Sequence, residues 1–166
     1  MAHAADTLSR ILPQLVELRH AIHQCPELAY EEEQTAARVC AALQDVPGLE
    51  LRTGGAGTGV VATLGADRPG HGVALRADMD ALAMEERTGA PWASRVPGKM
   101  HACGHDGHVT CLVGAARVLA ECADQLEGPV KFIFQPAEEG GAGGRRMCEE
   151  GVLEDPPVTA IFGFHG

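Results

Sequence analysis

Acidic side chains and one imidazole follow three apolar runs of this sequence. The run VALRA leads into Asp78 and Asp80, VKFIFQPA leads into Glu138 and Glu139, and TAIFGF leads into His165. In open α/β sheets, ligands bind beyond the carboxyl ends of the strands, so three strands would deliver these side chains to one edge. The sequence therefore predicts a single site at that edge.

A fourth contributor is the segment MHACGHDGH, residues 100–108, which directly precedes an apolar helical pattern. Cys103 and His105 stand two apart, a spacing that directs both side chains to one face of an extended stretch. A thiolate and an imidazole together suit zinc and other borderline divalent ions. Taken singly, a histidine or cysteine is more often structural, so the metal-site prediction depends on the convergence of all four segments.

The adjacent pair Glu138 and Glu139 is expected to point in two directions from the end of a strand. One glutamate could then bind a metal while the other moves protons. A metal lowers the pKa of bound water towards about 7, and a nearby carboxylate can accept that proton and pass it to a leaving amine. This chemistry is amide hydrolysis. The residues alone do not decide which glutamate has which role, and a solvated turn is the alternative for such a pair in isolation.

Two glycine clusters do not predict nucleotide binding. The glycines of residues 54–59 do not fit G-x-G-x-x-G and precede a strand, which indicates a turn between strands. Those of residues 140–144 lack the Lys-Ser/Thr of a phosphate loop and are expected to permit a close helix start beside the site. A serine nucleophile has no support, because Ser9 and Ser94 are the only serines and neither lies in G-x-S-x-G.

Helical and strand patterns alternate along the chain. Apolar spacing and flanking residues predict helices over 8–22, with Asp6 and Thr7 as candidate caps, and over 31–46, 109–120 and 145–150. Short apolar runs predict strands over 49–52, 60–64, 73–76, 130–134 and 158–164. This alternation predicts an α/β fold, an α/β/α sandwich around a mostly parallel sheet. The histidines His20 and His23, at the end of the first helix, are expected to be structural.

Composition limits the possible classes of protein. The chain has 166 residues, 45% of them hydrophobic, which is typical of one globular domain. Its 13 basic and 23 acidic residues give a net charge of −10, so nucleic acid and anionic membrane are poor partners. The sequence has neither a signal-peptide pattern nor a bilayer-spanning apolar run, so a cytoplasmic location is expected. Six dispersed cysteines predict reduced thiols.

Six segments together resemble a known family. RHAIHQCPELAYEE, GTGVVATLG, ALRADMDAL, GKMHACGHDGH, FIFQPAEEGGAGGRRM and IFGFHG occur in this order. They resemble the hippurate hydrolase and indole-acetyl-amino-acid hydrolase type of amidohydrolase, within the aminoacylase and carboxypeptidase-G-like metallopeptidases. The resemblance covers residues 18–166, and HACGHD followed by QPAEEGG is its most specific part.

The resemblance assigns roles to the predicted site residues. It implies a centre of two divalent metal ions held by Cys103, His105, Glu139 and His165. Glu138 matches the family's general acid/base, and Asp78 and Asp80 match residues that orient ligands; we include Asp80 in the catalytic set. His101 and His108 are not carried over as ligands, and Asp106 is expected to be a helix cap or a partner of a ligand.

The resemblance also implies a reaction. Water held by the metals would attack the amide carbonyl of an N-acyl amino acid, and Glu138 would take its proton and pass it to the departing amine. The products would be a carboxylic acid and a free amino acid. Manganese or zinc is expected first, with cobalt and nickel as alternatives, since a cysteine ligand disfavours magnesium and calcium.

Members of the resembled family are much longer than this chain. Beyond the segment matching IFGFHG they carry a smaller dimerisation domain and then one more ligand histidine. We therefore expect residues 1–166 to be the N-terminal portion of a catalytic domain, and a homodimer remains open for a full-length parent. The alternative is a catalytically incomplete metal-binding or interaction fragment.

Overall fold

The computed structural model describes the backbone of residues 2–166 and the side chains from residue 4 onwards. The chain alternates helices and strands as the sequence predicts. In order, the elements are α1 (Ala2–His23), α2 (Glu33–Leu43), β1 (Leu49–Gly55), β2 (Gly59–Leu64), β3 (Gly72–Asp78), α3 (His105–Glu121), a 3-10 turn (Ala123–Gln125), β4 (Val130–Gln135), α4 (Gly143–Glu149) and β5 (Val158–Gly163).

The five strands form one sheet in the order β1-β2-β4-β3-β5. β3 pairs in parallel with both β4 and β5, whereas β2 pairs antiparallel with β1 and β4. Only β2 therefore runs against the other strands, and the prediction of a mostly parallel sheet is confirmed. Because β3, β4 and β5 run the same way, their carboxyl ends meet at one edge of the sheet.

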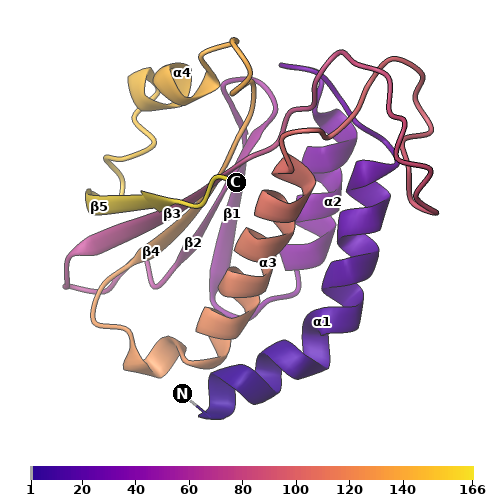
Figure 1. Cartoon of the computed structure of the whole chain (residues 1–166). Helices are drawn as coiled ribbons and strands as arrows, with labels where there is room; N and C mark the ends of the chain where they lie inside the picture. The colour runs from indigo at the N-terminus through magenta and orange to yellow at the C-terminus, as the bar shows by residue number, and fades with distance from the viewer. Residues whose placement is uncertain (1) are drawn as a thin grey trace.

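Helices cover both faces of the sheet, so the sandwich prediction is confirmed (Figure 1). On one face, α1, α2 and α3 enclose the main core, in which Phe132, Phe134 and Leu43 are fully buried. On the other face, Met147 of α4 packs against Ile133. In the described part of the chain this second helical layer consists of α4 alone.

The central strand β4 is buried along its whole length because β2 and β3 flank it on both sides. A continuous apolar run is typical of such a strand. Lys131 and Gln135 are the polar exceptions, and the ammonium group of Lys131 donates a 2.7 Å hydrogen bond to the carbonyl of Val152. Burial lowers the pKa of this lysine.

Several helix boundaries differ from the prediction, and α3 begins at His105, four residues earlier than predicted. α1 begins at Ala2, so Asp6 and Thr7 lie inside the helix and do not cap it. Thr7 is buried and donates a hydrogen bond to Glu121 at the end of α3, and this contact favours an earlier helical turn. α2 is shorter than predicted, because its N-cap is Glu32 and it ends at Leu43.

α1 packs against the core with Ile11 and Ile22, which are buried, and leaves Leu8 and Leu12 exposed. No described helix is both long enough and apolar enough to cross a bilayer.

Both glycine predictions are confirmed. Gly54, at the register shift near the end of β1, and Gly57, in the tight turn between β1 and β2, have φ values of 92° and 98°, a region of backbone space that favours glycine. At Gly143, the first residue of α4, a Cβ atom would lie 1.8 Å from the carbonyl oxygen of Pro136. Only glycine permits the helix to start this close to the end of β4.

Candidate metal centre

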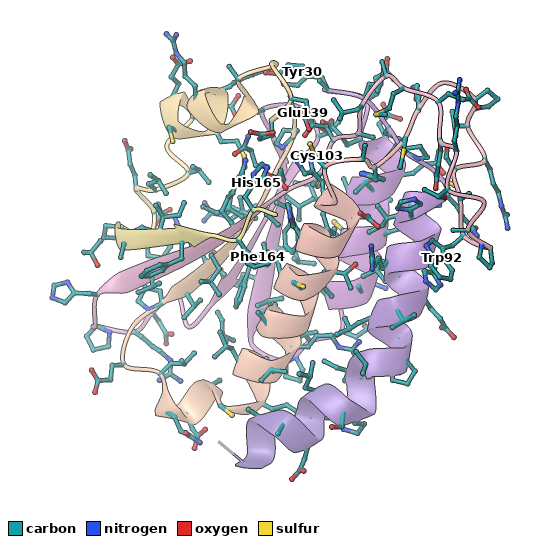
Figure 2. The ribbon with its side chains drawn as sticks, viewed as in Figure 1. Tyr30, Trp92, Cys103, Glu139, Phe164 and His165 are labelled. Atoms are coloured by element: carbon teal, nitrogen blue, oxygen red, sulfur yellow. The ribbon has the colours of Figure 1, made fainter. Side chains whose placement is uncertain are left out.

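The predicted site residues come together at the carboxyl edge of β3, β4 and β5. Cys103 approaches from the segment before α3, Glu139 from the loop after β4, and His165 from beyond β5; Figure 2 shows these three side chains close together. Asp78, at the end of β3, and Asp80, just beyond it, are both buried beneath them. The sheet topology thus brings the four predicted segments to the same edge of the sheet.

His105 is the centre of the arrangement and is fully buried. Its Nδ1 lies 2.8 Å from the carbonyl oxygen of Asp80, which can only accept, so Nδ1 carries the ring proton. Nε2 therefore presents a lone pair and has no hydrogen-bond partner. Three carboxylates face this nitrogen, at 3.6 Å (Asp78), 3.8 Å (Glu138) and 3.7 Å (Glu139).

Two overlapping groups of donor atoms share His105. Within each group the donor atoms lie within 4.8 Å of one another. The groups are Cys103, His105 and Glu139, and Asp78, His105, Glu138 and His165. Oε1 of Glu139 is also buried without a hydrogen-bond partner. These two atoms, Nε2 of His105 and Oε1 of Glu139, have no hydrogen-bond partner and lie among sulfur, nitrogen and carboxylate ligand atoms, a combination that fits a borderline divalent metal ion. The contact of His105 Nδ1 with a carbonyl also fits, because a histidine that binds a metal characteristically donates its other N–H to a carbonyl or carboxylate.

The electrostatics of the cluster favour positive charge. Burial alone would lower the pKa of His105, but hydrogen bonding to Asp80 and the charges of Asp78 and Asp80 outweigh it and raise the pKa. A hydrogen bond to Glu139, burial and the neighbouring carboxylates raise the pKa of the Cys103 thiol to about 11. A cation bound among these groups would offset the repulsion that opposes the thiolate.

Asp80 positions other site residues through hydrogen bonds. Its Oδ1 and Oδ2 accept hydrogen bonds of 2.9 Å from the backbone N–H groups of Glu138 and Glu139. Burial alone would raise the pKa of Asp80, but hydrogen bonds from His105 and from these N–H groups hold it below its usual range. Asp80, which we included in the catalytic set, is therefore placed to hold both glutamates.

The two glutamates approach the same imidazole, with Oε2 of Glu138 at 3.8 Å and Oε1 of Glu139 at 3.7 Å from Nε2 of His105, but they belong to different groups of potential ligands. β4 ends at Gln135, before the glutamates, so the loop and not the strand sets their positions. Ala137 has a left-handed backbone conformation, with φ 52°, and turns the chain just before Glu138.

His108 contributes a contact that the sequence interpretation missed. The backbone N–H of Gly166 donates to Nε2 of His108, so Nδ1 carries the proton and donates to Oδ1 of Asp78 at 2.6 Å. Oδ2 of Asp78 accepts from Arg76 at 2.6 Å and lies 3.2 Å from Nδ1 of His165. The three-residue spacing of two histidines at the start of α3 places both on one helix face and could have indicated this contact.

A second buried cluster lies behind the site. Asp106 accepts a hydrogen bond from Arg19 and lies 2.9 Å from Nδ1 of His23, and it makes no capping bond to α3, so the cap prediction is wrong. His101 is buried without hydrogen-bond partners, and burial lowers its pKa to about 4. His20 stacks on Trp92, which lies apart from the site beside α1 (Figure 2).

The sequence is similar to known hydrolases and deacetylases along most of its length. The chain is 52% identical over 153 residues to IAA-amino acid hydrolase ILR1-like 4 of Arabidopsis thaliana, a match covering 91% of this chain and 33% of that protein. It is 44% identical over 158 residues to N-acetyl-L-cysteine deacetylase of Bacillus subtilis, covering 95% of this chain and 37% of the relative. The chain thus spans about a third of the length of these relatives.

A solved structure shares the fold. A Bacillus subtilis protein described as a dinuclear metal-binding peptidase superposes with a TM-score of 0.88 at 40% identity, covering 95% of this chain and 44% of that chain. The model of peptidase family M20/M25/M40 matches residues 74–166, from β3 through every predicted ligand. The resemblance drawn from the six segments is confirmed, and this chain belongs to peptidase family M20/M25/M40.

Proposed function

We propose that this chain provides the metal-binding and proton-transfer residues of an amidohydrolase that cleaves N-acyl amino acids into a carboxylic acid and a free amino acid. The observation that carries the proposal is the unpartnered Nε2 of His105, shared by two groups of potential ligands. Relatives named as an IAA-amino acid hydrolase and an N-acetyl-L-cysteine deacetylase support this substrate class.

The proposed centre holds two divalent ions, with Cys103, His105, Glu139 and His165 as ligands. The dinuclear metal-binding peptidase of the same family supports this number. Bound ions would lower the pKa of coordinated water and polarise the amide carbonyl. Zinc or manganese suits the mixed sulfur, nitrogen and oxygen donors, with cobalt and nickel as alternatives.

Glu138 is the proposed general acid/base. Its side chain is 31% exposed, and Oε2 lies 3.8 Å from the buried Nε2 of His105, so the carboxylate faces both the centre and solvent. It can accept a proton from the attacking water and deliver it to the departing amine. Asp80 has a positioning role, because its oxygens hold the N–H groups of both glutamates.

A catalytically incomplete metal-binding or interaction fragment is the second candidate. Two observations favour it for these 166 residues alone. The chain spans about a third of its relatives, and the side chain of His165 is 43% exposed, although we propose it as a ligand. Under either candidate, we propose that residues 1–166 form the N-terminal portion of the catalytic domain.

The test is metal content and hydrolysis of hippurate and N-acetyl amino acids, measured for this chain and for a full-length relative. We expect Glu138→Gln, or its equivalent in the relative, to retain metal and lower kcat by about 10²- to 10⁴-fold. The control is Glu149→Gln, which removes only an exposed contact with Arg145. Unchanged kcat in the Glu138 variant would contradict the mechanism, and metal binding by an inactive chain would favour the fragment.

A further inference from the structure

Glu32 is a fully buried glutamate that the proposed reaction does not use. We propose that Glu32 is a positioning residue, whose carboxylate holds the backbone N–H of Ala137 and so sets the direction in which Glu138 and Glu139 enter the site. This inference rests on the proposed roles of those two glutamates. It concerns how the chain places them.

The carboxylate of Glu32 makes no capping hydrogen bond to α2. Glu32 is the N-cap of α2, a position where an acidic side chain normally accepts from the backbone N–H groups two or three residues ahead. Here Glu27 accepts from the N–H groups of Gln34 and Thr35, at 3.0 and 2.8 Å. The start of α2 is thereby capped from outside, and the carboxylate of Glu32 is directed elsewhere.

Both oxygens of Glu32 accept hydrogen bonds from distant parts of the chain. Oε1 accepts from the N–H of Ala137 at 2.8 Å, and Oε2 accepts from the hydroxyl of Thr58 at 2.5 Å. Within the described side chains, Glu32 forms no ion pair with Lys, Arg or His. A buried carboxylate is costly unless hydrogen bonds satisfy it, so these two contacts account for its presence.

Ala137 is the point at which this contact affects the site. Its left-handed φ of 52° is unfavourable for a residue with a Cβ atom, and such a conformation persists when its surroundings hold it. The N–H of Ala137 is held by Glu32, and the next two N–H groups are held by Asp80. Two buried carboxylates thus bind three consecutive backbone donors, and both glutamates are directed towards His105.

The test uses variants that separate three properties: the length of the side chain at position 32, its charge, and the stability of the fold. Glu32→Gln keeps an oxygen for Ala137, and its amide group can donate to the hydroxyl of Thr58, so we expect it to behave as the wild type. Glu32→Asp keeps the charge and a favoured N-cap residue, but it is one methylene too short to reach Ala137. The matched control is Val39→Ala, which opens the core beneath the same helix without touching Ala137.

The first readout is amide hydrogen exchange at residues 137–139 in the metal-free 166-residue chain. We expect Glu32→Asp to accelerate exchange at these three amides by about tenfold or more, beyond any acceleration at amides elsewhere in the chain. Val39→Ala should lower Tm and leave the relative protection of these amides unchanged. If Glu32→Asp exchanges as the wild type does, or if Val39→Ala reproduces its effect, Glu32 is only a structural contact of α2 and the inference is overturned.

The second readout is zinc affinity of the same variants, with Glu139→Gln as the reference. We expect Glu32→Asp to weaken zinc binding by about 10- to 100-fold and Glu32→Gln to leave it near the wild-type value. If Glu139→Gln has no effect on zinc affinity, the proposed ligand set fails, while the exchange readout still decides the role of Glu32. If Glu139→Gln weakens binding and Glu32→Asp does not, only the positioning inference fails.

Discussion

At the scale of single residues, the site is organised around one imidazole whose proton is fixed by a carbonyl. While Nδ1 of His105 donates to the carbonyl of Asp80, the neutral ring has only one tautomer, and Nε2 is its unprotonated nitrogen. Cys103 is the softest potential donor of the cluster, and its thiol is surrounded by carboxylates. The donor at position 103 should therefore determine which metal the chain prefers.

We predict that Cys103→Asp shifts metal preference from zinc towards manganese. A carboxylate is a harder donor than a thiolate, so zinc affinity should fall by at least about 100-fold while manganese affinity falls less. Competitive titration with a chromophoric chelator measures both constants. Cys111→Ser, which replaces an exposed cysteine, is the control. Equal losses for the two metals would show that sulfur does not set the preference.

At the scale of elements, the loop between β3 and α3 carries Cys103 and is anchored on α1 through Glu86. The carboxylate accepts from the hydroxyl of Thr88 and from the N–H of Ser94, and it lies 3.3 Å from Nε2 of His23. Burial alone would raise the pKa of Glu86, but these hydrogen bonds outweigh it and hold the pKa below its usual range. The anchor therefore depends on pH.

We predict that the stabilising effect of Glu86 disappears in acid. The pKa of Glu86 is lower in the folded chain than in the unfolded chain, so the unfolded chain takes up the proton first as the pH falls. The contribution is complete above the ordinary value of 4.5 and is lost as the pH falls through the lower, folded-state pKa. Urea unfolding of the wild type and Glu86→Gln measures it. Their difference in unfolding free energy should shrink between pH 6 and about pH 3.5, and a constant difference would contradict the anchor.

Most elements were predictable because their apolar spacing is local. Strand order was not, because pairing joins residues that are far apart in the chain: β4 lies between β2 and β3 although it follows both. The convergence of Glu139 and His165 was predictable because β4 and β5 both run parallel to β3, whereas the positions of Cys103 and His105 depend on where α3 begins.

Glu32 could not be singled out from the sequence. It lies in a run of three glutamates, and local pattern does not distinguish it from Glu31 and Glu33. In the structure those two neighbours are exposed, Glu31 pairs with Lys99, and only Glu32 points inward. Its role depends on the position of Ala137, which lies 105 residues further along the chain.

At the scale of the whole molecule, apolar side chains lie on the surface beside the site. β5 is the last strand of the sheet, and one of its edges is unpaired within the described chain. Its residues Ile161 and Phe162, and Phe164 just beyond it, are exposed. A cavity between β5 and α3, of about 300 Å³, is lined by Phe162, Phe164 and Leu112. Exposed apolar edge strands favour self-association.

We predict that the isolated chain self-associates with increasing concentration and that Phe162→Lys and Phe162→Glu both reduce this. The two variants change the net charge of −10 in opposite directions, so a shared effect would come from the lost apolar surface. Because Phe162 is 62% exposed, either change should alter the unfolding free energy by less than about 1 kcal/mol. Sedimentation velocity across a concentration series measures the association. A decrease in only one variant would indicate charge as the cause.

The strand order also limits when the site can form. β2 and β3 are neighbours in the chain but not in the sheet, so the hairpin of β1 and β2 can form early, whereas β3 has no partner until Gln135 has been synthesised. Closing such long loops has an entropic cost and slows folding. During synthesis, Asp78 at the end of β3 therefore emerges long before Glu139 and His165, and the four proposed ligands can meet only after the residues beyond β5 have been made.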